Sequence, residues 1–133
     1  MVIYSNAAEQ VLAVGQSLTL TKISGCNCNT QINPTPGAKV KGNGVFGVAF
    51  SGNIASATAS VPIQLSIAIN GVAIPTTQMD DTPAAADTFR NVSTVTGFSG
   101  NCCCLGTNIT VVNTGTNPVT VAANSSLVVW QDN

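Results

Sequence analysis

The sequence predicts an all-β protein of about eight to ten short antiparallel strands, arranged as a sandwich or a barrel. Gly (12 residues) and Pro (6 residues) interrupt the chain repeatedly, and Thr, Val, Ile and Asn are frequent between them. This composition favours strands and turns, and almost no stretch has the apolar spacing of a helix. The length of 133 residues suits one domain, so we expect a single domain over residues 1–133.

The first half contains three expected strand regions. Residues 2–4 form a short first strand, and residues 16–23 alternate Leu18 and Leu20 with threonines, as a half-buried strand does. Residues 38–41 and 45–50 flank a Gly-Asn-Gly sequence, which predicts a hairpin.

The clearest strand pattern covers residues 63–70, where Ile and Leu alternate with smaller or polar residues. Asn70 and Gly71 then predict a tight turn, because both central positions of that turn need positive φ. Residues 72–74 are expected to form the returning strand after this turn. Residues 76–89 are expected to be a connector, since Pro83 interrupts a regular ladder. The remaining expected strands are residues 89–98, 109–113, 119–122 and 127–130.

The composition predicts a self-associating protein. Hydrophobic residues make up 44% of the chain and charged residues only 7%, whereas a typical soluble domain is about a quarter charged. No apolar run approaches the roughly 18 to 20 residues that span a bilayer, so we expect no membrane segment. Large, weakly charged surfaces mark interfaces, and we expect this surface to be covered by copies of the same chain.

The charge balance excludes one class of partner. The net charge is −1, and the cations are Lys22, Lys39, Lys41 and Arg90. Because a phosphate backbone is bound through clusters of positive charge, we expect no nucleic-acid binding. The start, MVIYSNAAEQ, has no basic segment before an apolar one, so we expect no secretory signal.

Catalytic chemistry has little support in this sequence. Without histidine there is no Ser-His-Asp triad, Cys-His pair or imidazole ligand. Asp80, Asp81 and Asp87 cluster, but a calcium loop would supply more oxygen ligands, and we interpret the segment as a solvated loop. We expect no enzyme, no catalytic residue and no cofactor.

Five cysteines, Cys26, Cys28, Cys102, Cys103 and Cys104, leave three alternatives open. They can pack as small apolar groups, form disulfides within or between subunits, or bind a metal through four thiolates. The spacing is not that of a zinc ribbon, and an odd number is a poor fit to a secreted disulfide scaffold.

The second half resembles a known family. VPIQLSIAINGVAIPTTQM, FRNVSTVTGF and NCCCLGTNITVVNTGTNPVTVAANSSLVVWQ are similar to small all-β domains of spore-forming Firmicutes and their bacteriophages, over residues 61–131. Relatives include the C-terminal domains of collagen-like exosporium glycoproteins, which resemble tumour-necrosis-factor and complement jelly rolls. The resemblance implies an antiparallel jelly-roll sandwich and a homotrimer.

The first half is similar to stand-alone members of this family, which open with V-I-Y, V-A-x-G-Q-S-L and S-G-C and occur near virion structural genes of phages. No collagen Gly-X-Y repeat precedes the domain in this sequence. The resemblance therefore implies a capsid decoration or head-fibre protein on the virion surface, partnered by the major capsid protein or another particle surface protein. The alternatives are an exosporium or cell-surface structural domain on a spore, and a receptor- or carbohydrate-binding module.

The implied trimer suggests where subunits meet. A loop near a three-fold axis occurs three times around it, so we expect Cys102, Cys103 and Cys104 at a subunit contact. Residues 1–10 are expected to dock on a partner. Within this segment we expect Val2, Ile3 and Tyr4 to be interface residues. Trp130 is expected in the core or at the interface, because lone aromatic residues in strands usually pack.

Overall fold

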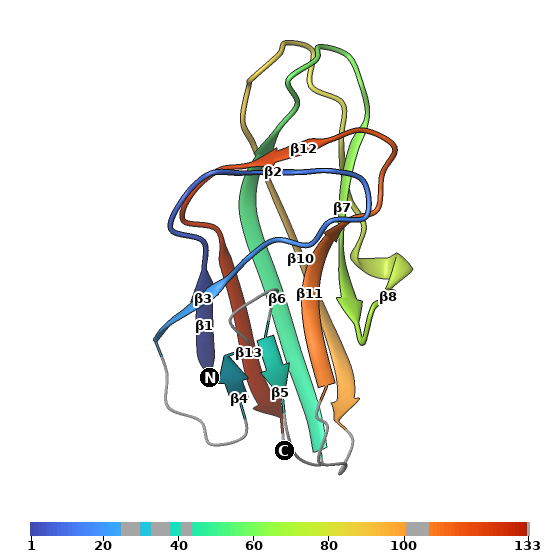
Figure 1. Ribbon diagram of the computed structural model, residues 1–133. Coiled ribbons are helices and arrows are strands. Elements are labelled where there is room, and N and C mark those ends of the chain that lie inside the picture. Colours follow the sequence, from blue (N-terminus) through green and yellow to red (C-terminus); the bar gives the residue numbers. More distant parts are fainter. Residues whose placement is uncertain (25–29, 33–37, 41–43, 101–106, 133) are drawn as a thin grey trace.

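The computed structural model describes residues 1–24, 30–32, 38–40, 44–100 and 107–132, which fold as a sandwich of two antiparallel sheets (Figure 1). The elements are β1 (Val2–Ser5), β2 (Gln10–Leu12), β3 (Thr21–Ser24), β4 (Thr30–Ile32), β5 (Ala38–Val40), β6 (Gly44–Ala55), β7 (Ile63–Ile69), β8 (Val72–Ala73), η1 (Pro75–Thr77, a 3-10 helix), β9 (Met79–Asp81), β10 (Arg90–Gly100), β11 (Thr107–Asn113), β12 (Val119–Val121) and β13 (Ser126–Asp132). The all-β, antiparallel prediction is confirmed. The described residues contain thirteen strands instead of eight to ten, because β2, β4 and β9, of three residues each, were not expected.

The first sheet, called sheet A, is built around β6. This strand of 12 residues pairs with β10 along one side, and with β13 and then β12 along the other. Beyond β13 come β1 and β3, and β2 pairs with β12. Because β1 and β13 are antiparallel neighbours, the two chain ends lie toward the same end of the sandwich (Figure 1).

The second sheet, called sheet B, has the order β4-β5-β11-β7-β8, and β9 also pairs with β7. Its central strands are among the most apolar of the chain: Ile63, Leu65 and Ile67 of β7 are all buried. β9 corrects the expected connector, because Met79–Asp81 is a strand that lies before Pro83 and is not interrupted by it.

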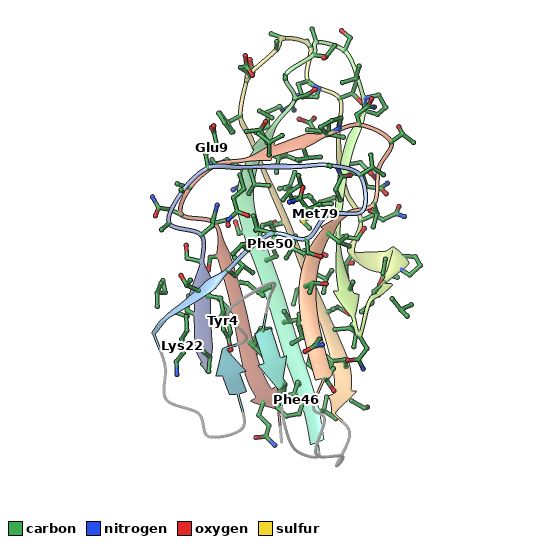
Figure 2. All side chains as sticks on the ribbon, in the orientation of Figure 1. Tyr4, Glu9, Lys22, Phe46, Phe50 and Met79 are labelled. Carbon is green, nitrogen blue, oxygen red and sulfur yellow. The ribbon has the colours of Figure 1, made fainter. Side chains whose placement is uncertain are left out.

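The core lies between the two sheets. Figure 2 shows Phe46, Phe50 and Met79 projecting into this space. Alternation along β6 and β13 supplies the sheet A side, and burying each large side chain contributes about 1.5–3 kcal/mol. The largest fully buried side chains are Tyr4, Phe46, Phe50, Leu12, Leu18, Leu20, Ile54, Ile63, Leu65, Ile67, Ile109 and Leu127.

The predicted Asn-Gly turn is confirmed. Asn70 has φ of 51° and Gly71 has φ of 83°, and the strands on either side, β7 and β8, pair. The Asn70 side chain also accepts a hydrogen bond of 2.9 Å from the backbone N–H of Asn108, and its own N–H donates to the Asn108 carbonyl at 2.8 Å. The turn is thereby attached to the neighbouring strand β11.

The hairpin predicted from residues 38–50 is wrong. β5 pairs with β4 and β11 in sheet B, whereas β6 belongs to sheet A. Ala38 and Val40 of β5, and Phe46 and Val48 of β6, are buried from opposite sides of one core. β5 and β6 are therefore close in sequence but lie in different sheets, and they do not pair with each other.

The strand predicted over residues 16–23 begins only at Thr21, although Leu18 and Leu20 are buried as their alternation predicts. The Gln10 side chain explains the difference. Its amide donates to the Thr19 carbonyl at 2.8 Å and accepts from the Thr19 N–H at 2.9 Å. A side chain thus satisfies the backbone groups that a neighbouring strand would otherwise pair.

Candidate assembly surface

The outer surface of sheet A carries apolar side chains that point away from the core. We call these residues the apolar face: Ile3, Val45, Ala49, Val95, Val128 and Trp130. Side chains alternate along a strand, so Ile3 between buried Val2 and Tyr4 projects outward. The same alternation turns Ala49 and Val128 outward, and the register then places Val95 on this side.

The strand register aligns four of these residues in one row. Val95 of β10 pairs with Ala49 of β6, Ala49 pairs with Val128 of β13, and Val128 pairs with Ile3 of β1. Val95 is 64% exposed and Val45 is 52% exposed, so the face is open in a single chain. An apolar row across four strands is a surface that gains free energy when another surface covers it.

Trp130 lies beside this row, against Gly47. The register brings together Trp130, Gly47 and Gly97 on neighbouring strands. A Cβ atom on Gly47 would lie 2.2 Å from Trp130 Cζ2, closer than atoms can approach. The indole ring therefore covers the Gly47 backbone, and Trp130 is half-buried by its own chain.

A shallow hollow opens on the same surface between β6 and β10. Its volume is about 420 Å³, and it is lined by Ala49, Phe50, Ser51, Ser93, Thr94 and Val95. The small outward side chains Ala49, Ser51 and Ser93 leave this space unfilled. Its size suits one or two protruding side chains of another surface.

Around the hollow, the outward side chains of β6, β10 and β13 are polar and uncharged. Ser51 pairs with both Ser93 and Ser126, and the Asn91 side chain donates to Asn53 Oδ1 at 3.2 Å. The strands β1, β6, β10 and β13 contain only two charged residues, Arg90 and Asp132, each at a strand end. Covering this surface therefore removes few charges from water, which keeps the desolvation cost low.

The structure brings together Ile3 and Trp130, two of the predicted interface residues, on this one surface. It corrects the expectation for Val2 and Tyr4: each is 0% exposed in the single chain, so both side chains pack in the core and are not available to a partner. Side chains alternate along β1, so Val2 and Tyr4 face the core and Ile3 faces outward.

Residues 1–10 are mostly committed to the fold. Asn6 is buried, and its side chain donates to the carbonyls of Ala8 and Ala122 at 3.0 and 2.9 Å. Ala7, Ala8 and Glu9 are exposed, and Figure 2 shows Glu9 projecting outward from the segment that leads into β2. The cysteines of the predicted subunit contact and of the alternative thiolate site, Cys26, Cys28, Cys102, Cys103 and Cys104, lie outside the described residues.

Four residues of the apolar face, Val45, Ala49, Val95 and Val128, were not predicted from the sequence. The signal was present, because strict alternation assigns a core side and an outer side to every strand. Alternation does not give the register between strands, and the register decides whether outward residues on different strands lie side by side.

A separate pocket of about 300 Å³ contains Gln64, Asp80, Asp81 and Thr114. Thr114 donates to Gln64 Oε1 at 2.8 Å, and Gln64 donates to Asp80 Oδ1 at 2.6 Å. Asp81 lies 3.5 Å from Arg90, measured from Oδ1 to Nη1. Across the residues that the structure describes, no group of three or more His, Cys, Asp or Glu is arranged to hold a metal ion, and no helix is long and apolar enough to cross a membrane.

Comparisons with known proteins give likeness in structure alone. No protein-family model matches the chain, and no curated protein does. Among solved structures, Eiger TNF from S. frugiperda superposes with a TM-score of 0.76 at 9% identity, covering 99% of this chain and 91% of that one. Murine APRIL at pH 5.0 gives a TM-score of 0.70 at 9% identity, covering 98% of both chains. At such identities the likeness concerns the fold, and it confirms that this chain is an antiparallel jelly-roll sandwich.

Proposed function

We propose that this protein is a non-enzymatic structural protein that assembles as a homotrimer through the apolar face. The row Val95–Ala49–Val128–Ile3 carries the proposal. It aligns one exposed apolar side chain, Val95, and three half-buried ones in register over four strands, in a chain with 7% charged residues. Monomeric proteins rarely leave a continuous apolar surface of this kind uncovered.

A second copy of the same chain is the occupant that this surface fits best. The surface is uncharged, so two copies meet without repulsion between like charges. The hollow beside Ala49 accepts side chains, and exposed valines such as Val45 and Val95 are of suitable size. The number three is supported by the sequence resemblance to trimeric jelly rolls.

The site of action that we propose is a particle surface, most specifically that of a bacteriophage virion, as a capsid decoration or head-fibre protein. The sequence resemblance to stand-alone phage chains supports this. The partner would be the major capsid protein or another particle surface protein, and a spore exosporium is the alternative location. Of residues 1–10, the exposed segment around Glu9 is the part free to dock on the partner protein.

Light scattering on two matched variants tests the assembly. Val128→Lys places a charge in the centre of the apolar face, whereas Val72→Lys places the same charge on β8 in sheet B, where Val72 is 71% exposed. We expect Val128→Lys to abolish every species with three chains, and Val72→Lys to assemble as the wild type does. Trimers of Val128→Lys at the wild-type affinity would overturn the proposed interface.

A further inference from the structure

The edges of the two sheets differ sharply in how they are protected. An edge strand offers unpaired backbone N–H and C=O groups, and proteins usually protect it by shortness, charge, proline or a bulge. Within the described part of the chain the edge strands are β2, β3, β4, β8, β9 and β10. β2, β4 and β9 have three residues each and β8 has two. β3 has four residues, contains Lys22, and pairs with β1 through an irregular register.

β10 has none of these protections. It is 11 residues long and pairs with β6 in unbroken register from Arg90 to Gly100. After Arg90 it contains no charged residue and no proline, and its only hydrogen-bonded neighbour among the described strands is β6. β9 of sheet B and the 3-10 helix η1 lie near it, but neither pairs with it. Its second side is thus a regular, uncharged template for another strand.

We propose that β10 pairs antiparallel with β10 of a second copy, so that sheet A continues across two subunits. Antiparallel pairing of a strand with itself has two-fold symmetry, and the same surface serves on both subunits. A partner whose edge carried Lys or Pro would be disfavoured, whereas a second β10 brings the same uncharged side chains. No like charges then face each other along the shared edge.

The paired edges would form enough hydrogen bonds for a stable contact between two subunits. Two paired strands of this length form about ten backbone hydrogen bonds, which is as many as a typical stable protein–protein interface contains. The contact uses the edge of sheet A, whereas the proposed trimer uses its outer surface. The two contacts together join trimers into larger assemblies, and edge pairing does not depend on the trimer being correct.

Charges placed on the edge strand test the pairing. Asn91 and Ser99 are exposed on β10 and lie outside the hollow. Pairing over the full length of the strand is centred on Val95, so it sets Asn91 of one subunit opposite Ser99 of the other. We expect Asn91→Lys/Ser99→Lys and Asn91→Glu/Ser99→Glu each to lose all species larger than a trimer, because like charges then face each other across the shared edge. An equimolar mixture of the two should recover these species. Asn53→Lys is the control, because Asn53 is exposed on β6, one strand farther from the edge and outside the hollow, and this variant should assemble as the wild type does.

Three outcomes of native mass measurements overturn the edge pairing: a wild type without species larger than a trimer, equal loss in Asn53→Lys and Asn91→Lys/Ser99→Lys, or a mixture that does not recover. Val128→Lys separates the two proposals, because edge pairing predicts that this variant still forms dimers. A monomeric Val128→Lys would contradict the edge pairing and leave the trimer intact.

A pair of proline variants, Val95→Pro and Thr96→Pro, provides a second test. Successive backbone N–H groups of a strand point to opposite sides. One variant therefore removes an N–H that donates to β6, and the other removes an N–H that points to the free edge. We expect one variant to lose thermal stability and the other to keep it while losing the larger assemblies; a stable variant that retains them would overturn the proposal.

Discussion

The indole ring of Trp130 lies directly over Gly47, so close that a methyl group there would be 2.2 Å from Cζ2. Only glycine leaves room for this arrangement, in which an aromatic ring covers the backbone of the central strand of sheet A. The contact sets the shape of the apolar face, because it keeps the largest outward side chain of β13 flat against the sheet. A ring that stood upright would separate the face from any flat partner surface.

Gly47→Ala is therefore expected to displace the ring. The added methyl group would overlap the indole, so the ring or the backbone must move. Overpacking of this kind lowers the free energy of unfolding by about 1–3 kcal/mol. Trp130 is the only tryptophan, so its fluorescence emission reports the displacement as a shift to longer wavelength. Gly97→Ala is the matched control on the next strand, where the nearest atom, the Phe46 carbonyl oxygen, is 3.5 Å from the new Cβ. Equal spectra for the two variants and the wild type would contradict this description.

Asn6→Ala is expected to destabilise the fold by about 3 kcal/mol, because it leaves buried backbone groups without partners. Asn6 Oδ1 accepts from the Ser125 N–H at 3.0 Å and from the Ser125 hydroxyl, and its amide donates to the Ala122 carbonyl at 2.9 Å. Urea unfolding measures the loss. Asn91→Ala, which removes an exposed amide from β10, should change the free energy of unfolding by less than about 0.5 kcal/mol. Similar values for both variants would refute the structural role of Asn6.

Thr77→Val tests a buried hydroxyl that replaces a strand partner. Thr77 is 0% exposed; its Oγ1 accepts from the Ile67 N–H at 2.9 Å and donates to the Ile74 carbonyl at 2.7 Å. Valine keeps the shape but leaves that N–H unpaired, and we expect a loss of about 1–3 kcal/mol in the free energy of unfolding. The exposed neighbour gives the control, Thr76→Val, for which we expect almost no change. An unchanged melting temperature for Thr77→Val would show that the hydroxyl is dispensable.

The features predictable from the sequence are those decided locally. The strand over residues 63–69 has one apolar side by alternation, and the Asn70–Gly71 turn follows from the need for positive φ. Both are properties of a few consecutive residues. The same holds for the inward side chains of β6 and β13, which the period of two assigns to the core.

The features that were missed depend on contacts distant in sequence. β5 and β6 have the pattern of a hairpin, and only the shared core shows that they belong to different sheets. The side chain of Gln10 replaces a strand beside Thr19, which no periodicity reveals. Val2 and Tyr4 were expected at an interface, but the position of β1 between β13 and β3 directs them inward and leaves Ile3 outside.

The native mass of the purified wild-type protein, measured over a range of concentrations with and without reductant, tests the central claim of self-assembly through the apolar face most directly. We expect the smallest stable species to have three times the chain mass of 13.4 kDa, and larger species to contain multiples of three chains. Loss of the trimer on reduction would place cysteines between subunits, in addition to the apolar contact. A protein that remains a monomer at every concentration, in both conditions, would contradict the account.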